Sequence, residues 1–196
     1  MKKNIPPLFP DTHYHIYNRG INKENLFKEK SNYPYFLKLY FKYIDPIAYT
    51  HSYCLLKNHF HLLIKTKDDE IIKNIRIFEK DYDSSQIISM QFSHLFNSYA
   101  QAINKYFLRT GGLFETPFRR IEIAEESHLM QIVRYIHYNP EKHSFSNNFT
   151  NYPYSSYRHL INGKSKLLDT KTVLQWFGSK EDFIAYHTER PAEINF

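Results

Sequence analysis

The sequence predicts an α+β fold in which helices pack on an antiparallel sheet, and three observations lead to this prediction. The chain has 196 residues, the size of one domain or of one domain with an extension. Hydrophobic residues make up 42% of it, which is enough to fill a core. Segments with the periods of strands and helices follow the order β-α-β-β-α-β, and a further helix comes after them. That order is typical of a ferredoxin-like sandwich, an antiparallel sheet with helices on one face.

The first half of this pattern combines strand composition with one helical repeat. Three strands and one helix are expected: the strands over 12–18, 47–56 and 59–66, and the helix over 31–43. Lys57 and Asn58 form a short connection, so the second and third strands form a hairpin. Gly20 lies in the turn after the first strand, where we expect a positive φ.

The second half supplies two longer helices and the last strand. They are expected over 87–107 (helix), 118–123 (strand) and 127–139 (helix). Gly111 is the expected C-cap of the first helix, Ser127 the N-cap of the second, and Pro140 its end. The chain then divides into a core of residues 1–143 and a helical C-terminal extension, 144–196. The extension includes a capped helix over 169–178 with Trp176 buried, and we expect its tail, 191–196, to be mobile.

The composition of the chain indicates which class of molecule the protein binds. The net charge is +6 with a pI of about 9.2, and aromatic residues make up 17% of the chain. Positive charge attracts phosphate and exposed rings stack on unpaired bases, so a polyanionic partner is indicated. Cys54 is the single cysteine, which excludes an intrachain disulfide and a cysteine-rich zinc site. The sequence has no apolar run of about 18 residues, so we expect a cytoplasmic protein associated with the nucleoid.

Two histidines lie two residues apart in the third predicted strand. Side chains at this spacing share one face of a strand, so His59 and His61 point together and Phe60 points into the core. Two imidazoles on one side begin a metal site. With 11 histidines in the chain, chance alone gives roughly 0.6 such pairs, so the motif is also compatible with two strand histidines that only form hydrogen bonds. A rival pair, His13 and His15, lies in the first strand.

The last core helix carries a matching pair of polar residues. Tyr135 and Asn139 are four residues apart and therefore share a helix face. Together with the two strand histidines they make a set that suits phosphoryl transfer: His59, His61 and Asn139 hold a divalent ion, and Tyr135 is the nucleophile. The ion polarises a phosphoryl oxygen, and the tyrosine displaces a nucleic-acid oxygen to form a covalent phosphotyrosine.

Other tyrosines compete for the role of nucleophile. Tyr99 belongs to the apolar stripe of its helix and is expected in the core. Tyr106 lacks a carboxamide or carboxylate four positions later, where the chain has Thr110. Tyr138 shares its face with Arg134 and Lys142, which indicates solvent or a DNA contact.

With these residues in place, the chain resembles a known family, the REP-associated tyrosine transposases, which are a branch of the single-tyrosine HUH transposases. The resemblance spans roughly residues 12–145, and "YPYSSY" (Tyr152–Tyr157) extends it. Its motifs are "HYHIYNRG" (His13–Gly20), "YCLLKNHFHLLIK" (Tyr53–Lys65), "FNSYAQAINKYFLRTGGLFETPFRR" (Phe96–Arg120) and "RYIHYNPEK" (Arg134–Lys142). One departure follows the Asn-Pro pair, where the family often has "VRAG" and this chain has Glu141, Lys142 and His143.

The resemblance implies a role for each matching residue. His59 and His61 match the metal-binding histidines of the HUH motif, Tyr135 matches the catalytic tyrosine, and Asn139 matches the polar residue that completes the metal site. It also implies an HUH nuclease core that uses Mg²⁺ or Mn²⁺ to cleave and rejoin single-stranded hairpin DNA. The expected products are a 5′-phosphotyrosine and a free 3′-OH. A monomer and a homodimer that exchanges the tyrosine helix both remain open.

Arginines and lysines near these motifs are candidates for DNA contacts. The candidates are Arg19, Lys57, Lys105, Arg109, Arg119, Arg120 and Arg134. Two other functions remain open: a non-catalytic single-stranded nucleic-acid-binding protein on the same fold, and a zinc hydrolase unrelated to DNA. The zinc hydrolase needs a third strong ligand and has no use for Tyr135.

Overall fold

The computed structural model describes residues 6–75, 82–163 and 165–188. Its core elements are β1 (His13–Arg19), α1 (Asn32–Ile44), β2 (Ala48–Leu56), β3 (His59–Thr66), α2 (Asp69–Lys73), α3 (Ser84–Tyr106), β4 (Arg119–Glu122) and α4 (Ser127–Lys142). The elements after the core are α5 (Tyr157–Asn162), α6 (Thr170–Phe177) and α7 (Lys180–Thr188). Two 3₁₀ turns, η1 (Ile21–Lys23) and η2 (Phe149–Asn151), complete the chain. The predicted mobile tail at 191–196 lies outside the described residues.

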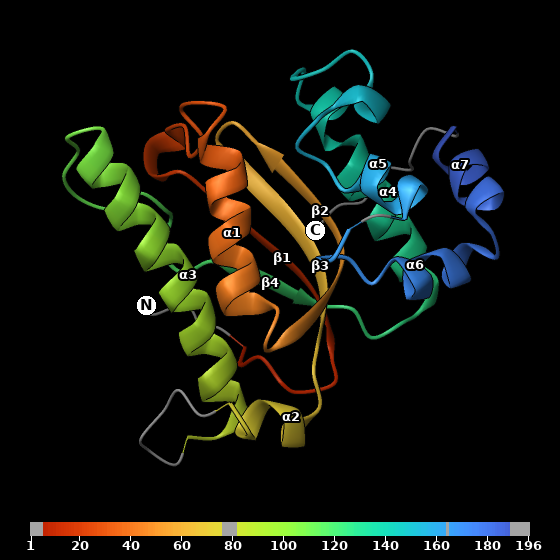
Figure 1. The fold of residues 1–196 in the computed structure, drawn as a ribbon, viewed down its shortest axis with the longest axis horizontal. Coiled ribbons are helices and arrows are strands. Elements are labelled where there is room, and N and C mark those ends of the chain that lie inside the picture. Colours follow the sequence, from red (N-terminus) through yellow and green to blue (C-terminus); the bar gives the residue numbers. More distant parts are fainter. Residues whose placement is uncertain (1–5, 76–81, 164, 189–196) are drawn as a thin grey trace.

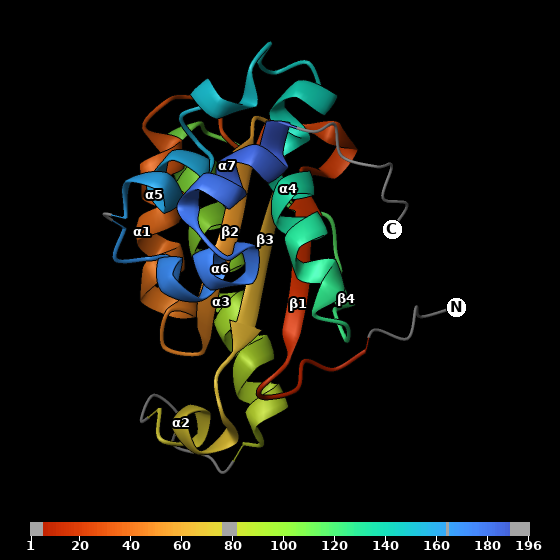
Figure 2. The ribbon, with the colours of Figure 1, turned by 90° about the vertical axis from the view of Figure 1, so that its right-hand side faces the viewer.

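The four strands form an antiparallel sheet in the order β2-β3-β1-β4, and the predicted ferredoxin-like α+β class is confirmed. Helices α1 and α3 cover one face of this sheet (Figure 1). Helix α4 crosses the other face, together with the C-terminal helices (Figure 2). Helix α2 was not predicted, because its five residues fall in a polar stretch.

The alternation of side chains along β3 separates the core from the opposite face of the sheet. Phe60 packs against Phe36 of α1 and Phe96 of α3, with ring centroids 5.4 and 5.8 Å apart. His59 and His61 therefore point the other way, toward α4. The sequence prediction that these two histidines share the face opposite Phe60 is confirmed.

The prediction for Gly20 was wrong. Its φ is −65°, and the positive φ values fall instead on Asn22 and Lys23, at 52° and 62°. Glycine is needed for close packing, because a Cβ at position 20 would lie 2.0 Å from the carbonyl oxygen of Glu24. Gly111 has a positive φ of 84° but lies beyond the end of α3, whose C-cap is Phe107.

The predicted start of the helix at Ser127 is confirmed, but its predicted N-cap and its predicted end were wrong. Ser127 is the first helical residue after an N-cap at Glu126, and the helix runs through Pro140 to Lys142. Proline removes one backbone donor but does not forbid the next residues from being helical. The turn closes when the N–H of His143 donates to the carbonyl of Asn139 at 3.0 Å.

The C-terminal extension continues the sheet at its β2 edge. Leu168 bridges Thr50 in parallel, and Ser155 bridges Cys54 antiparallel. Asp169 caps α6, as expected. Trp176 is half-buried rather than buried, and its ring packs edge-on against the buried His51 with centroids 4.7 Å apart. In the described ranges, no helix has the length and apolar character needed to cross a membrane.

Candidate active site

Strand register brings the histidines of β3 beside polar residues of β1. His59 pairs with Arg19, and His61 pairs with Tyr17. Paired residues in an antiparallel sheet present their side chains to the same face. The periodicity of β1 adds His15 to this face, where its ring centroid lies 5.2 Å from that of His61.

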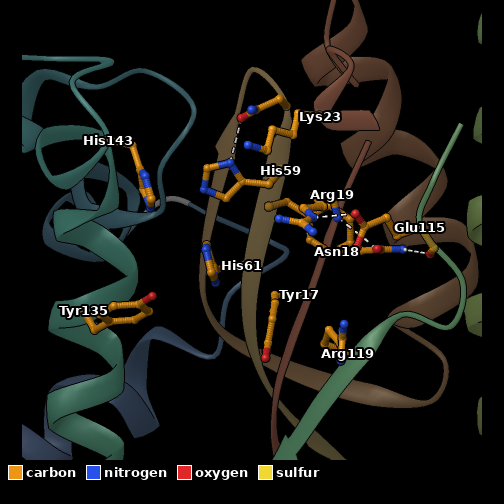
Figure 3. Close-up of a pocket in the computed structure, with 12 residues that line it drawn as sticks. Tyr17, Asn18, Arg19, Lys23, His59, His61, Glu115, Arg119, Tyr135 and His143 are labelled. Carbon is orange, nitrogen blue, oxygen red and sulfur yellow. Dashed lines mark hydrogen bonds and ion pairs between the residues drawn. The ribbon is translucent and has the colours of Figure 1, made fainter. Parts of the chain in front are cut away.

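An open cleft of about 590 Å³ lies between this face and α4 (Figure 3). It brings together five residues named from the sequence: Arg19, His59, His61, Arg119 and Tyr135. Residues that the sequence did not place in the site also line it: Tyr17, Asn18, Lys23, Asn58, Phe60, Glu115 and His143. The cleft therefore combines imidazoles, one helix tyrosine and several cations on one surface.

His59 and His61 differ in their hydrogen bonds. The Nδ1 of His59 lies 2.7 Å from the side-chain oxygen of Asn58, while its Nε2 is buried and has no hydrogen-bond partner in the described part of the chain. The Nδ1 of His61 lies 3.0 Å from the Nε2 of His15. When His61 donates this bond, its own Nε2 is left unprotonated as a lone-pair donor.

Burial keeps these imidazoles neutral. It lowers the pKa of His59 to about 4, helped by the neighbouring His143 and Arg19. Burial also lowers the pKa of His15 to about 3 and holds the pKa of His61 well below its usual range. Neutral imidazoles are the form that binds metal ions.

Tyr135 faces the histidine surface from α4. Its ring centroid lies 5.7 Å from that of His61 and 6.0 Å from that of His15 (Figure 3). Burial raises the pKa of Tyr135, and Tyr17 adds to this effect, whereas a hydrogen bond from the Asn139 side chain opposes it. The phenol is therefore neutral at pH 7 and needs electrostatic help to act as a nucleophile.

Asn139 is fully buried one turn after Tyr135. Its amide nitrogen donates to the Tyr135 carbonyl at 2.7 Å, and its Oδ1 has no hydrogen-bond partner among the described residues. A buried carbonyl oxygen without a partner is costly unless something binds it. Across the described ranges, no three His, Cys, Asp or Glu side chains form a metal-like cluster, and Asn139 is not among the residues that line the cleft.

Lys142 and His143, at the end of α4, lie beside this site, whereas Glu141 accepts from the backbone N–H of Phe149 in the extension. The Lys142 ammonium is 4.9 Å from the centroid of the Tyr135 ring. The ring of His143 packs edge-on against His59, with centroids 4.7 Å apart. Burial lowers the pKa of His143, which favours its neutral form.

Four of the seven candidate DNA-binding residues lie on or beside the cleft. Arg19 pairs with Glu115 at 2.6 Å, and Arg119 is exposed on β4. Lys57 and Arg109 line an adjoining hollow of about 580 Å³. Lys23 lines both hollows and so connects them, and Glu24, which pairs with Arg109, also lines the second.

The other three candidates lie elsewhere. Lys105 is exposed near the end of α3 and lines neither hollow. Arg120 points to the sheet face opposite its neighbour Arg119, where its guanidinium stacks on Phe118 at 4.0 Å. Arg134 is buried, and its guanidinium donates to the carbonyl of Tyr186 at 3.2 Å. We therefore leave Arg120 and Arg134 out of the cleft surface.

Tyr99 and His13, two of the side chains that competed for a role in the site, are structural. Tyr99 is fully buried as expected, and its hydroxyl donates to the carbonyl of Leu26 at 2.8 Å. His13 and His15 do not act as a pair, because His13 packs on His51 at 5.3 Å whereas His15 bonds His61. Sequence reasoning missed the place of His15 beside Tyr135. The signal available was the alternation His13, His15, Tyr17 along one strand face.

No protein-family model matches the chain, and no curated protein matches it. Among solved structures, the chain is similar to a REP-associated tyrosine transposase bound to a REP hairpin, with a TM-score of 0.63 and 15% identity over 87% of this chain and 90% of that one. Two structures of a bacterial tRNA(His) guanylyltransferase-like protein, with GTP and with ATP, give TM-scores of 0.45 and 0.46 at 8% and 12% identity. These cover 76% and 88% of this chain and 73% and 72% of theirs. The first of these likenesses shows that the chain has the fold of the hairpin-bound transposase.

Proposed function

We propose that the protein is a single-tyrosine HUH endonuclease and strand transferase that acts on hairpin-forming single-stranded DNA. The observation that carries this proposal is the meeting of Tyr135 with His61 and His59 in one cleft lined by cations. The same fold is shared with a transposase bound to a REP hairpin. The alternative of a non-catalytic nucleic-acid-binding protein does not require a tyrosine to face two neutral imidazoles.

Tyr135 is the nucleophile in this reaction. Its Oη forms a bond to phosphorus, the bond from phosphorus to the 3′ oxygen breaks, and the phenolic proton leaves to solvent. The 3′ oxygen departs as a hydroxyl after it takes up a proton. One phosphoester replaces another, so the 5′-phosphotyrosine can be attacked by a 3′-OH to rejoin a strand. The Lys142 ammonium beside the ring favours the phenolate that forms as the proton leaves.

His59 and His61, which line the cleft, and Asn139 of α4 would hold a divalent ion between them. The unpartnered Nε2 of His59 and Oδ1 of Asn139 fit this role, because both are buried lone-pair donors without another partner among the described residues. A carbonyl oxygen is a hard ligand that suits Mg²⁺ or Mn²⁺. When bound, the ion supplies a positive charge that polarises the phosphoryl oxygen.

A denaturing gel tests the proposal. The protein is incubated with Mn²⁺ and with labelled single-stranded hairpin oligonucleotides taken from the DNA that flanks its own gene. We expect a protein–DNA adduct that survives denaturation and requires the metal. Tight binding without an adduct would favour the non-catalytic alternative, and hydrolysis without an adduct would favour a metal hydrolase.

The cleft arginines are expected to bind phosphates of the DNA strand. Replacing Arg119 by Gln should lower the dependence of hairpin affinity on salt, reducing the slope of log K against log [salt] by about 0.7 for one phosphate on a single strand. The matched control is Arg158→Gln, because Arg158 is an exposed arginine engaged with the carbonyl of Thr150 in the extension. Equal slopes for both variants, measured by fluorescence anisotropy, would remove Arg119 from the DNA surface.

A further inference from the structure

We propose that α7 is a positioning element of the active site. Helix α7 contacts α4 at His137 through His187 and at Arg134 through Tyr186, and so fixes the position of Tyr135 relative to the histidines of its own chain. The inference rests on the proposed function, since it assigns α7 a role in placing the proposed nucleophile. Figure 1 shows α4 between the sheet and α7.

Helix geometry separates the two sides of α4. At 100° per residue, position 137 lies roughly 200° around the helix from position 135. Tyr135 accordingly faces His61 on the sheet, while His137 is fully buried on the far side. A contact that holds His137 therefore restrains the rotation and position of the helix that carries Tyr135.

A directed chain of hydrogen bonds holds that far side. The Nδ1 of His187 donates to the carbonyl of Phe183 at 2.7 Å, because a carbonyl can only accept. In a neutral ring its Nε2 must then accept, and the Nδ1 of His137 donates to it at 2.9 Å. The Nε2 of His137 in turn accepts from the hydroxyl of Ser156 at 2.7 Å. Every nitrogen of the two rings thus has a defined role.

A second contact between α7 and α4 lies next to the first. Tyr186 precedes His187 on α7, and Arg134 precedes Tyr135 on α4. The Arg134 guanidinium stacks on the Tyr186 ring at 4.3 Å and donates to its carbonyl at 3.2 Å, with only 8% of the arginine exposed. Two consecutive residues of α7 therefore hold α4 at positions just before and just after Tyr135.

The same chain of bonds reaches the strands that carry the cleft. The Oγ of Ser156 accepts from the backbone N–H of Tyr53 on β2 at 2.9 Å. The next residue of β2, Cys54, pairs across the sheet with His61. The extension thus ties α7, α4 and the sheet of one chain together, an arrangement in which Tyr135 serves the histidines of that chain. A misplacement of reacting groups by about 1 Å can cost roughly a hundredfold in rate.

Two substitutions at His187 test this contact. The matched control is Thr188→Ala, because Thr188 is exposed and its hydroxyl donates to the carbonyl of Ala185 within α7. His187→Leu removes the acceptor, whereas His187→Gln offers an oxygen in its place. We expect His187→Leu to slow adduct formation by about tenfold to a hundredfold with hairpin affinity within about twofold of the unmodified protein. His187→Gln should recover part of the rate, and Thr188→Ala should not change it.

Three results would overturn the inference: an unchanged adduct rate in His187→Leu, a loss that His187→Gln does not relieve, or a loss explained by weaker hairpin binding. Absence of any adduct with the unmodified protein would instead overturn the proposed function on which the inference rests.

A mixing experiment tests the same inference when His187→Leu does not fold. Tyr135→Phe and His61→Ala are combined in equal amounts with the hairpin and Mn²⁺. We expect no adduct above that of either variant alone, because each chain lacks one part of its own site. Recovery of the adduct would mean that one chain lends its tyrosine helix to another, which would overturn the inference.

Discussion

Replacement of Tyr135 by Phe is expected to abolish the covalent protein–DNA adduct, with a loss of at least about a thousandfold in its rate of formation. The change removes the oxygen that is proposed to attack phosphorus and keeps the ring that packs against His61 and His15. Hairpin affinity should stay within about threefold, because the cations that bind phosphate are untouched. Single-turnover gels and fluorescence anisotropy measure the two quantities separately.

The matched control for this prediction is Tyr138→Phe. Tyr138 lies on the same helix, but its ring packs near Phe149 and it does not line the cleft. We expect its adduct rate to equal that of the unmodified protein. A normal adduct in Tyr135→Phe, or its loss in Tyr138→Phe, would show that the nucleophile is a different tyrosine.

Replacement of His61 by Ala is expected to have the second largest effect. The ring of His61 packs against that of Tyr135, and its Nδ1 lies within hydrogen-bond distance of His15, which orients it. Burial holds the pKa of His61 well below its usual range, so the ring is neutral. Its loss removes one proposed ligand of the ion, and we expect adduct formation to fall by about a hundredfold or more. The concentration of Mn²⁺ needed for half-maximal rate should rise, while hairpin affinity measured without metal should not change.

His13→Ala is the control for that variant. His13 lies on the same sheet face but packs against His51 and Trp176, away from the cleft. It should leave both the rate and the Mn²⁺ dependence unchanged. If His61→Ala keeps the normal Mn²⁺ dependence, the ion is held by other residues and the proposed ligand set is wrong.

Local periodicity was enough to predict the two halves of the site. The strand predicted at 59–66 has the bounds of β3, because an aliphatic run lies between a two-residue turn and a polar stretch. Alternation then places His59 and His61 on one face, and four-residue spacing places Tyr135 and Asn139 together. What the sequence could not provide was the packing of α4 across the histidine face, which depends on contacts between distant segments.

Local geometry also explains why the predicted positions of some residues were wrong. Arg119 and Arg120 were treated as a pair, although neighbours on a strand point to opposite faces, and only Arg119 lines the cleft. Arg134 adjoins Tyr135 in sequence but lies roughly 100° around the helix from it, where Tyr186 covers it. The role of His15 depends on a diagonal contact between β1 and β3, which required the strand register.

The most direct test of the account is to identify the residue that becomes linked to DNA. The adduct formed with Mn²⁺ and the hairpin is digested with nuclease and protease, and the modified peptide is sequenced by mass spectrometry. The account predicts a phosphate, with or without attached nucleotide, on the hydroxyl of Tyr135 within the peptide that contains Asn139. A phosphate on any other residue, or cleaved DNA with no modified peptide, would contradict the proposed tyrosine mechanism.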